Sequence, residues 1–429
     1  MTPRAGTLRY VGLDVEAERL TAHYDLDGRS FREVVTFEGV GDLTGESARA
    51  IATLWYLVAG LSYYKTAAPG EVDLGATPVG PRALALLRAA ITDGLGEYAY
   101  RNDLDLSEVD VVGGGATAAP APIELDPARV LTPFGGGIDS IVTVETLADG
   151  LDQALFVVSP ERGRFDALEA AAAVTGRPIV RATRSLDPSL FTGEPTFLRG
   201  HVPVTAMVTL LGALGAVASG RGGVVMSNEH SASVPNLSWR GRGVNHQWSK
   251  SWAAEVLIAE AVAEAVGPAL SVASFLRDRS ELWVARRFSE LRQYHHVFRS
   301  CNRAFTQDPG ARAAGWCGEC DKCLFINLVL APFLERGELR DIFAGEPLAD
   351  PARVDQLRTL VGLSEEHKPF ECVGDPDESA QALRLVGARS DWRGVTPVAE
   401  TLDALGAVAT PGDPFVTTGP SRVPAHWFR

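Results

Sequence analysis

Three consecutive glycines, at positions 135 to 137, stand between an apolar run and a helix-like segment that begins with Asp139 and Ser140. The backbone N–H groups of such a turn and the positive end of the following helix can bind phosphate oxygens. A dinucleotide-binding fingerprint needs a third spaced glycine where Ser140 stands, and a Walker loop needs a lysine just before its serine or threonine. Neither template fits, and the acid inside the turn would repel a pyrophosphate unless a metal ion intervened.

The remaining pattern resembles the S-G-G-x-D-S loop of the PP-loop ATP pyrophosphatases, with glycine in place of the first serine. We expect Asp139 to hold Mg²⁺, which would bridge the phosphates and neutralise charge. The alternative is a tight glycine turn in which Asp139 or Ser140 caps the helix. Because the missing serine removes one hydroxyl but leaves the backbone cradle, its loss should affect pyrophosphatase activity more than nucleotide binding. The phosphate-binding residues are predicted to be Gly135, Gly136, Gly137 and Ser140.

Four of the five cysteines form a C-x15-C-x2-C-x2-C array between positions 301 and 323. Two-residue gaps let successive thiolates converge on one tetrahedral ion, and a distant fourth thiolate closes the site. With no open coordination position, the bound ion would be a structural zinc. Two alternatives are reduced cysteines in a small core, and His295 or His296 as a ligand in place of the first cysteine. The predicted zinc ligands are Cys301, Cys317, Cys320 and Cys323.

The fifth cysteine, Cys372, stands apart in the segment HKPFECVG. A lone cysteine is usually buried filler, but this one lies among polar and turn residues, where a reactive thiol is plausible.

A long polar segment, SNEHSASVPNLSWRGRGVNHQWSKSW, follows an apolar run at position 226. From residue 221 to 250 it carries four arginine or lysine residues against Glu229 alone, a net charge of +3. This is more hydrogen-bonding capacity than a passive connector needs, although a solvated loop remains the alternative. A second cluster, SYYKTAAP, could add phenols and a cation through Tyr64 and Lys65, but such residues are often only surface.

These residues must be positioned by a larger fold, and from about residue 128 apolar runs alternate with helix-like segments. This alternation predicts an α/β fold with a parallel sheet covered by helices on both faces. In such folds ligands bind beyond the carboxyl ends of the strands, which is where the glycine loop and the polar segment lie. The expected strands are 128–134, 154–159, 177–185, 222–229 and 269–275; the expected helices are 139–149, 164–175, 201–219 and 250–265.

The flanking regions have other patterns. Alternating residues on both sides of Asp27 and Gly28 predict a β-hairpin, because that pair tolerates positive φ. Residues 111–122, rich in Gly, Ala and Pro, are expected to form a loop or linker. We therefore predict a strand-containing N-terminal α+β domain at 1–122, an ATP-binding domain at 123–300 and a helical, Cys-rich C-terminal region at 301–429.

The composition excludes several classes of protein. The 429-residue chain is 46% hydrophobic and 22% charged, as in ordinary globular proteins. Its net charge of −14 disfavours nucleic acid or anionic lipid as a partner, so an anionic substrate would need a local basic pocket. Acidic residues near the start replace the apolar core of an export signal, and the apolar run 204–218 is too short to span a bilayer. We expect a cytoplasmic protein without a membrane span, with residues 204–218 as a buried helix.

Several motifs together resemble one family, the ATP-dependent UDP-N-acetylmuramoyl-L-alanyl-L-glutamate epimerases (MurL type) of bacterial peptidoglycan synthesis. The resemblance implies a PP-loop core of the adenine nucleotide alpha hydrolase-like class. It also implies epimerisation of the terminal L-glutamate of a nucleotide-sugar dipeptide, with ATP cleaved to AMP and pyrophosphate and Mg²⁺ required. The motifs that carry it, in order, are LSYYKTAAP, GLGEYAYRN, GGGIDS, SNEHSAS, NHQWSKS, WCGECDKC and HKPFECVG.

Two other functions stay open. A 7-cyano-7-deazaguanine synthase would share the PP-loop and the zinc array, but the long N-terminal region and NHQWSKS do not fit that family. A nucleotide-binding protein that has lost catalysis is suggested only by Gly135. Release of pyrophosphate would separate such a protein from both enzymes.

Adenylation of the substrate carboxylate would make the neighbouring α-proton removable, because the acyl carbonyl can share the carbanion charge. A base would then take the proton, an acid would return it on the other face, and water would release AMP. We prefer His230 and Cys372 for proton transfer, with His246 and Lys250 as further candidates and Glu229 behind them. Ser227 and Asn228 should contact the nucleotide. The residues expected to bind the substrate are Tyr64, Lys65, Arg240, Arg242, Gln247 and Ser249, with Lys250 as a further cation.

Overall fold

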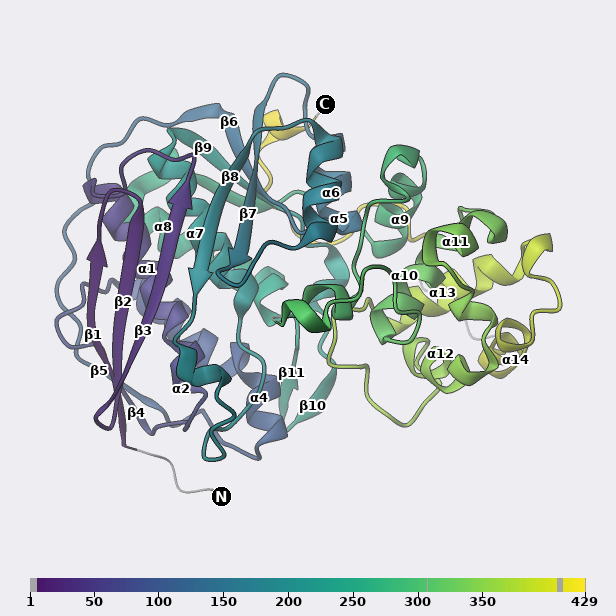
Figure 1. The fold of residues 1–429 in the computed structure, drawn as a ribbon, viewed down its shortest axis with the longest axis horizontal. Coiled ribbons are helices and arrows are strands. Elements are labelled where there is room, and N and C mark those ends of the chain that lie inside the picture. The colour runs from purple at the N-terminus through teal and green to yellow at the C-terminus, as the bar shows by residue number, and fades with distance from the viewer. Residues whose placement is uncertain (1–5, 307, 407–411, 429) are drawn as a thin grey trace.

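The computed structural model describes residues 6–306, 308–406 and 412–428, and it shows the predicted α/β fold (Figure 1). Within these residues, ten strands form one sheet in the order β12-β9-β6-β7-β8-β3-β2-β1-β4-β5. They are β1 (Thr7–Val15), β2 (Arg19–Leu26), β3 (Arg29–Glu38), β4 (Glu71–Asp73), β5 (Asp110–Val112), β6 (Asp126–Pro133), β7 (Asp152–Pro160), β8 (Ile179–Ser185), β9 (Arg221–Met226) and β12 (Ser271–Ser274). A separate hairpin pairs β10 (Leu237–Trp239) with β11 (Arg242–Val244).

The α-helices lie around this sheet and in a second group at the C-terminal end of the chain. They are α1 (Glu46–Ala59), α2 (Leu61–Tyr64), α3 (Pro81–Ala89), α4 (Gly96–Arg101), α5 (Ile138–Thr146), α6 (Asp166–Thr175), α7 (Val204–Ala218), α8 (Trp252–Val266), α9 (Glu281–Ser289), α10 (Asp321–Leu330), α11 (Arg336–Phe343), α12 (Val354–Leu360), α13 (Pro376–Gly387) and α14 (Thr396–Leu405).

In the parallel part of the sheet, the order in which the chain adds strands reverses beside β6. From β6 the chain runs outward through β7 and β8, and it then returns to place β9 on the other side of β6. The helices that follow β6 and β9 lie on opposite faces, because α5 contributes to one apolar core and α8 to the other. The loops after these two strands therefore diverge and open a crevice, the usual ligand position in open α/β sheets.

Side chains of the central strands alternate between two cores, as the pleat requires. Val130 packs on the α5 side and Leu131 on the α7 side; in β9, Val225 and Val224 divide in the same way. All the strands and helices predicted between residues 128 and 275 are confirmed, and the apolar run at 204–218 is the buried helix α7. No helix in the described part of the chain combines the length and apolar character that a bilayer crossing requires.

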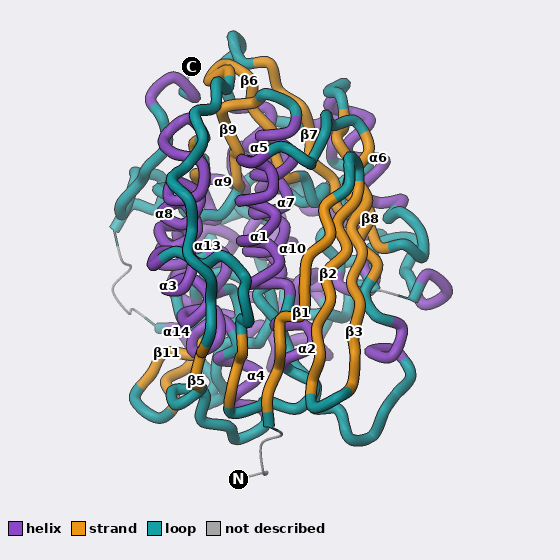
Figure 2. Tube along the Cα trace, turned by 90° about the vertical axis from the view of Figure 1, so that its left-hand side faces the viewer, coloured by secondary structure: helices purple, strands orange, loops and turns teal. Residues whose placement is uncertain are grey.

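The first strands extend the same sheet. The hairpin of β2 and β3 turns at Asp27 and Gly28, both with positive φ, as predicted. β3 then pairs antiparallel with β8, so the sheet is continuous across residue 122. Residues 111 and 112 end β5, and Gly115 forms an isolated bridge with Pro78; the rest of 111–122 is loop. Figure 2 shows these strands beside the helical layer of α1, α7 and α8.

The C-terminal helices α9 to α14 form a second body of the molecule, on the right of Figure 1. They share an apolar core with the α5 side of the sheet. The loop between α12 and α13 carries Cys372 and returns toward the crevice. The final segment also returns to the sheet, because the buried Trp427 lies against Gly223 of β9 and its carbonyl accepts a hydrogen bond from the Ala148 amide.

Candidate active site

The glycine loop joins β6 to α5 at the crevice. Gly136 has a φ of +74°, and a Cβ on this residue would lie 3.2 Å from the backbone of Leu168 in α6. A Cβ on Gly137 would lie 2.8 Å from the Ser300 hydroxyl, whereas one on Gly135 would meet nothing within 4 Å. Gly136 is therefore required by the geometry, whereas a side chain at Gly137 would have to displace the Ser300 hydroxyl. The position that departs from the S-G-G-x-D-S pattern has room for the missing serine.

Asp139, at the start of α5, belongs to a buried group of carboxylates. Its side chain and those of Glu229 and Glu281 place one oxygen each within 4.8 Å of the others. Asp139 Oδ1 and Glu281 Oε2 have no hydrogen-bond partner among the described residues. Burial and the nearby Glu229 raise the pKa of Asp139 to about 6, and the same two causes raise the pKa of Glu281. Closely spaced carboxylates of this kind suit a divalent cation with hard oxygen ligands.

A cavity of about 430 Å³ opens over the glycine loop. Among the described residues that line it are all the predicted nucleotide contacts except Gly136, namely Gly135, Gly137, Asp139, Ser140, Ser227 and Asn228. The Ser140 hydroxyl donates to the Gly137 carbonyl, and the Asn228 amide donates to the Ser274 hydroxyl. Three cationic side chains also line the cavity, Lys250, Lys322 and Arg299. The crevice thus combines a backbone cradle with positive charge, as an anionic ligand requires.

Cys372 lines the same cavity. Lys250 Nζ lies 3.6 Å from its sulfur, and Lys322 Nζ donates to its backbone carbonyl. Burial alone raises the pKa of the Cys372 thiol, but the ammonium of Lys250, the hydrogen bond to His246 and the ammonium of Lys322 outweigh it and lower that pKa to about 6. At neutral pH this thiol is therefore largely a thiolate, the basic and nucleophilic form.

His246 connects Cys372 to the N-terminal part of the chain. Its Nδ1 lies 2.5 Å from Glu97 Oε2, and its ring packs against that of His201 with centroids 4.2 Å apart. Burial by itself lowers the pKa of His246, but the hydrogen bonds to Cys372 and Glu97 raise it to about 9. For His201, burial and the nearby His246 lower the pKa to about 3, so that ring is neutral.

The polar segment 227–250 holds the Cys372 loop in place. Gln247 Nε2 donates to the carbonyl of Val373, and Asn236 Nδ2 donates to the carbonyl of Pro369. Ser249 is buried in the same segment. Gln247, predicted to bind substrate, thus contacts Val373, the neighbour of Cys372.

Other predicted residues lie elsewhere. The ring of His230 lies beside Gly419 of the C-terminal segment, and His230 is not among the described residues that line the cavity. Arg240 and Arg242 are on the β10–β11 hairpin, where the first pairs with Asp103 at 2.7 Å. Tyr64 is buried in the core, and Lys65 lines a different cavity and donates to the Gly200 carbonyl.

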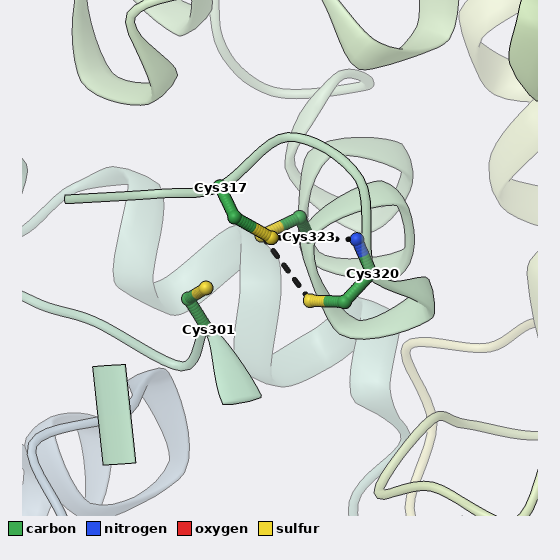
Figure 3. Close-up of side chains that lie close together, drawn as sticks. All are labelled: Cys301, Cys317, Cys320 and Cys323. Carbon is green, nitrogen blue, oxygen red and sulfur yellow. Dashed lines mark hydrogen bonds between the residues drawn. The ribbon is translucent and has the colours of Figure 1, made fainter. Parts of the chain in front are cut away.

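The four clustered cysteines converge, as Figure 3 shows. The sulfur of Cys323 lies 3.7 Å from that of Cys317 and 3.5 Å from that of Cys320. A tetrahedral zinc ion with Zn–S bonds of about 2.3 Å places its sulfur ligands roughly 3.8 Å apart. Cys301, on another segment, completes a set whose sulfur atoms all lie within 4.8 Å of one another. The four sulfur atoms therefore fit a structural zinc ion without rearrangement. His295, the alternative ligand, lies beside Glu338 instead.

Comparison with known proteins decides the family. Residues 3–275 match the model of the MurL N-terminal domain, and residues 297–413 match that of the MurL C-terminal domain. The chain belongs to the MurL family. Three similar MurL relatives are each named UDP-N-acetyl-alpha-D-muramoyl-L-alanyl-L-glutamate epimerase, and such enzymes are isomerases.

These MurL relatives span most of the chain. The protein of Salinispora tropica is 44% identical over 86% of this chain and 82% of its own length. That of a Micromonospora species is 39% identical over 99% and 97%, and that of Xanthomonas oryzae pv. oryzae is 36% identical over 90% and 87%.

Four residues of the site escaped sequence reasoning: Glu97, Glu281, Arg299 and Lys322. Glu97 and Lys322 lie within the motifs GLGEYAYRN and WCGECDKC, so their positions carried a signal. Glu281 and Arg299 follow no motif that the sequence analysis distinguished. They reach the crevice only because the start of α9 and the segment before Cys301 pack beside the glycine loop.

Proposed function

We propose that this protein epimerises the terminal L-glutamate of UDP-MurNAc-L-Ala-L-Glu to D-glutamate through carboxylate adenylation and α-proton exchange. The observation that carries the proposal is that the glycine loop and Cys372 line one cavity. A phosphate cradle and a thiol of lowered pKa at one site suit a reaction that first activates a carboxylate and then moves the adjacent proton. Membership of a family whose relatives bear this enzyme's name supports it.

In the first step the substrate carboxylate attacks the α-phosphorus of ATP, forming an acyl-adenylate and pyrophosphate. The backbone at Gly136 and Gly137 and the start of α5 hold the phosphates. Arg299 and Lys322, which line the cavity, supply positive charge for the leaving pyrophosphate. ATP cleavage makes the cycle irreversible and lowers the barrier, since the two glutamate stereoisomers are nearly equal in energy.

Magnesium fits the same crevice. Asp139 would hold it, and the unpartnered oxygens of Asp139 and Glu281 beside Glu229 provide the hard donors that Mg²⁺ prefers. Bound there, the ion would neutralise phosphate charge. These carboxylates would also be relieved of their mutual repulsion.

Cys372 is the group that we assign to proton removal on one face of the adenylated glutamate. Its thiolate accepts the α-proton while the acyl carbonyl takes the charge as an enolate. Two proton-transfer atoms on opposite faces of a carbon must lie about 6 Å apart, because each works at roughly 3 Å. Lys250 lies only 3.6 Å from the sulfur, so it acts on the same side as Cys372, where its ammonium stabilises both the thiolate and the enolate oxygen.

The test is incubation with ATP, Mg²⁺ and UDP-MurNAc-L-Ala-L-Glu in D₂O, followed by chiral analysis of glutamate and identification of the nucleotide product. We expect D-glutamate with deuterium at the α-carbon, AMP and pyrophosphate. ADP in place of AMP would exclude adenylation, and D-glutamate without label would exclude the carbanion route. Asp139→Asn should abolish AMP formation with the far-UV circular dichroism unchanged; continued pyrophosphate release would move the metal role to another residue.

A further inference from the structure

Glu97 is positioned by an unusual backbone conformation in the segment that precedes it. The chain between α3 and α4 forms a π-helical turn at Ala90–Gly94, a geometry that is often found at functional sites. A Cβ on Gly94 would lie 2.9 Å from the ring of Trp248, so the close approach of these two segments depends on glycine. The turn delivers Glu97, at the start of α4, to His246, which precedes Trp248 by two residues. The two partners are 149 positions apart in the sequence.

Both oxygens of the Glu97 carboxylate are engaged. Oε2 lies 2.5 Å from His246 Nδ1, and Oε1 accepts from Arg101 Nε at 2.6 Å. The other side-chain hydrogen bond of the imidazole is to Cys372. His201 packs against the imidazole face. The ring is therefore held between Glu97, His201 and Cys372.

We propose that Glu97 is a positioning residue that fixes His246 against Cys372, so that carboxylate, imidazole and thiol form a relay that keeps the thiol ionised. The part of this proposal that rests on the proposed function is that Cys372 transfers the substrate proton. The relay itself is a property of the free enzyme and does not depend on that function.

Other charges face these groups. Besides His246, Cys372 is surrounded by Lys250, Lys322 and Lys368 and by the carboxyl groups of Asp139 and Glu371. His246 is faced by Glu97, His201 and Glu371. Among these, only Glu97 and Cys372 hydrogen bond to the imidazole in the described part of the chain. Removal of the Glu97 charge should therefore act on Cys372 through His246.

The experiment measures the rate at which iodoacetamide alkylates Cys372 across pH 5 to 9, with peptide mass spectrometry to count that site alone and with no ATP or substrate present. In Glu97→Gln the imidazolium loses its carboxylate partner, so the thiolate is less stabilised. We expect the midpoint of the alkylation curve to rise by about one pH unit, which slows the reaction roughly fivefold near pH 6 and about tenfold at pH 5. In turnover the same variant should lower kcat with little change in KM.

Glu338→Gln is the matched control, because Glu338 Oε1 lies 3.0 Å from Nδ1 of the buried His295 in a second carboxylate–imidazole pair away from Cys372. Its alkylation curve should match the wild type. An unchanged curve in Glu97→Gln, or an equal shift in both variants, would overturn the relay. If Glu97→Gln does not fold, Glu97→Asp takes its place; it withdraws the carboxylate by one methylene, and a wild-type curve would again overturn the proposal. If the alkylation curve of Glu97→Gln shifts but the wild-type protein shows no epimerisation, the proposed function is refuted and the relay stands.

Discussion

The five cysteines divide into two environments that meet at Lys322. This lysine lies between Cys320 and Cys323 of the four-cysteine cluster, and its ammonium donates to the backbone carbonyl of Cys372. In the cluster each sulfur faces other sulfurs at metal-ligand spacing. Cys372 faces an ammonium and an imidazole instead, and it lines the cavity over the glycine loop. The neighbours of each thiol therefore differ: the four clustered thiols face one another, whereas Cys372 faces an ammonium and an imidazole.

The two cysteine sites also depend on each other. The cluster offers four thiolates, a full tetrahedral donor set, so an ion bound there would have a structural role. Cys372 lies on a loop between α12 and α13 that is held from outside, by Lys322 and by an Asn302 to Glu371 hydrogen bond on the cluster side. The cluster therefore supports the loop that carries the reactive thiol, and the two should be separable by mutation.

The largest effect is expected from the cluster. Cys320→Ser removes one of the four thiolates predicted to bind zinc, and because structural zinc binding would contribute folding free energy, we expect a loss of several kcal/mol in stability. Zinc content and thermal unfolding measure this loss, and activity should fall only because the Cys372 loop loses its support. A variant with full zinc content and an unchanged melting temperature would refute the tetrathiolate site.

Cys372→Ser should separate chemistry from structure. A serine hydroxyl is too weak a base to replace a thiolate, so epimerisation should fall by roughly 10²–10⁴-fold, the range attributed to general acid–base catalysis. Zinc content and melting temperature should stay at the wild-type values, in contrast to Cys320→Ser. Because adenylation precedes proton removal, substrate-dependent pyrophosphate release should persist. Full epimerase activity would assign the proton transfer to another group.

The same contrast shows what sequence could predict. The alternating apolar runs and the spacing of the four cysteines are local patterns, so the α/β elements and the convergence of the thiols were confirmed. The partners of Cys372 depend on packing between distant segments. Glu97 is brought to His246 by a π-helical turn that no periodicity indicates.

Local conformation also separates residues that the sequence places together. His230 was preferred because it follows the fourth predicted strand, but it begins a short 3₁₀ turn and its ring lies at Gly419. Arg240 and Arg242 gave the polar segment its positive charge, yet the hairpin carries the first of them to Asp103. The cations that line the cavity come from other places, with Lys250 alone among those predicted. Net charge of a segment therefore did not indicate where its side chains lie.

The smallest effect is expected from Lys250→Met, which leaves Cys372 in place and removes the ammonium 3.6 Å from its sulfur. This ammonium is the strongest of the charges that lower the pKa of Cys372 to about 6, so the variant should have a higher thiol pKa. Since only the thiolate reacts, alkylation by iodoacetamide at pH 5 should slow by roughly tenfold for each unit of increase and recover above the new pKa. Lys65→Met, at a partly buried lysine that lines another cavity, is the control and should match the wild type. If Lys250→Met gave an unchanged curve, the thiolate would owe its stability to His246 and the relay through Glu97, and the expected shift in Glu97→Gln would have to be correspondingly larger.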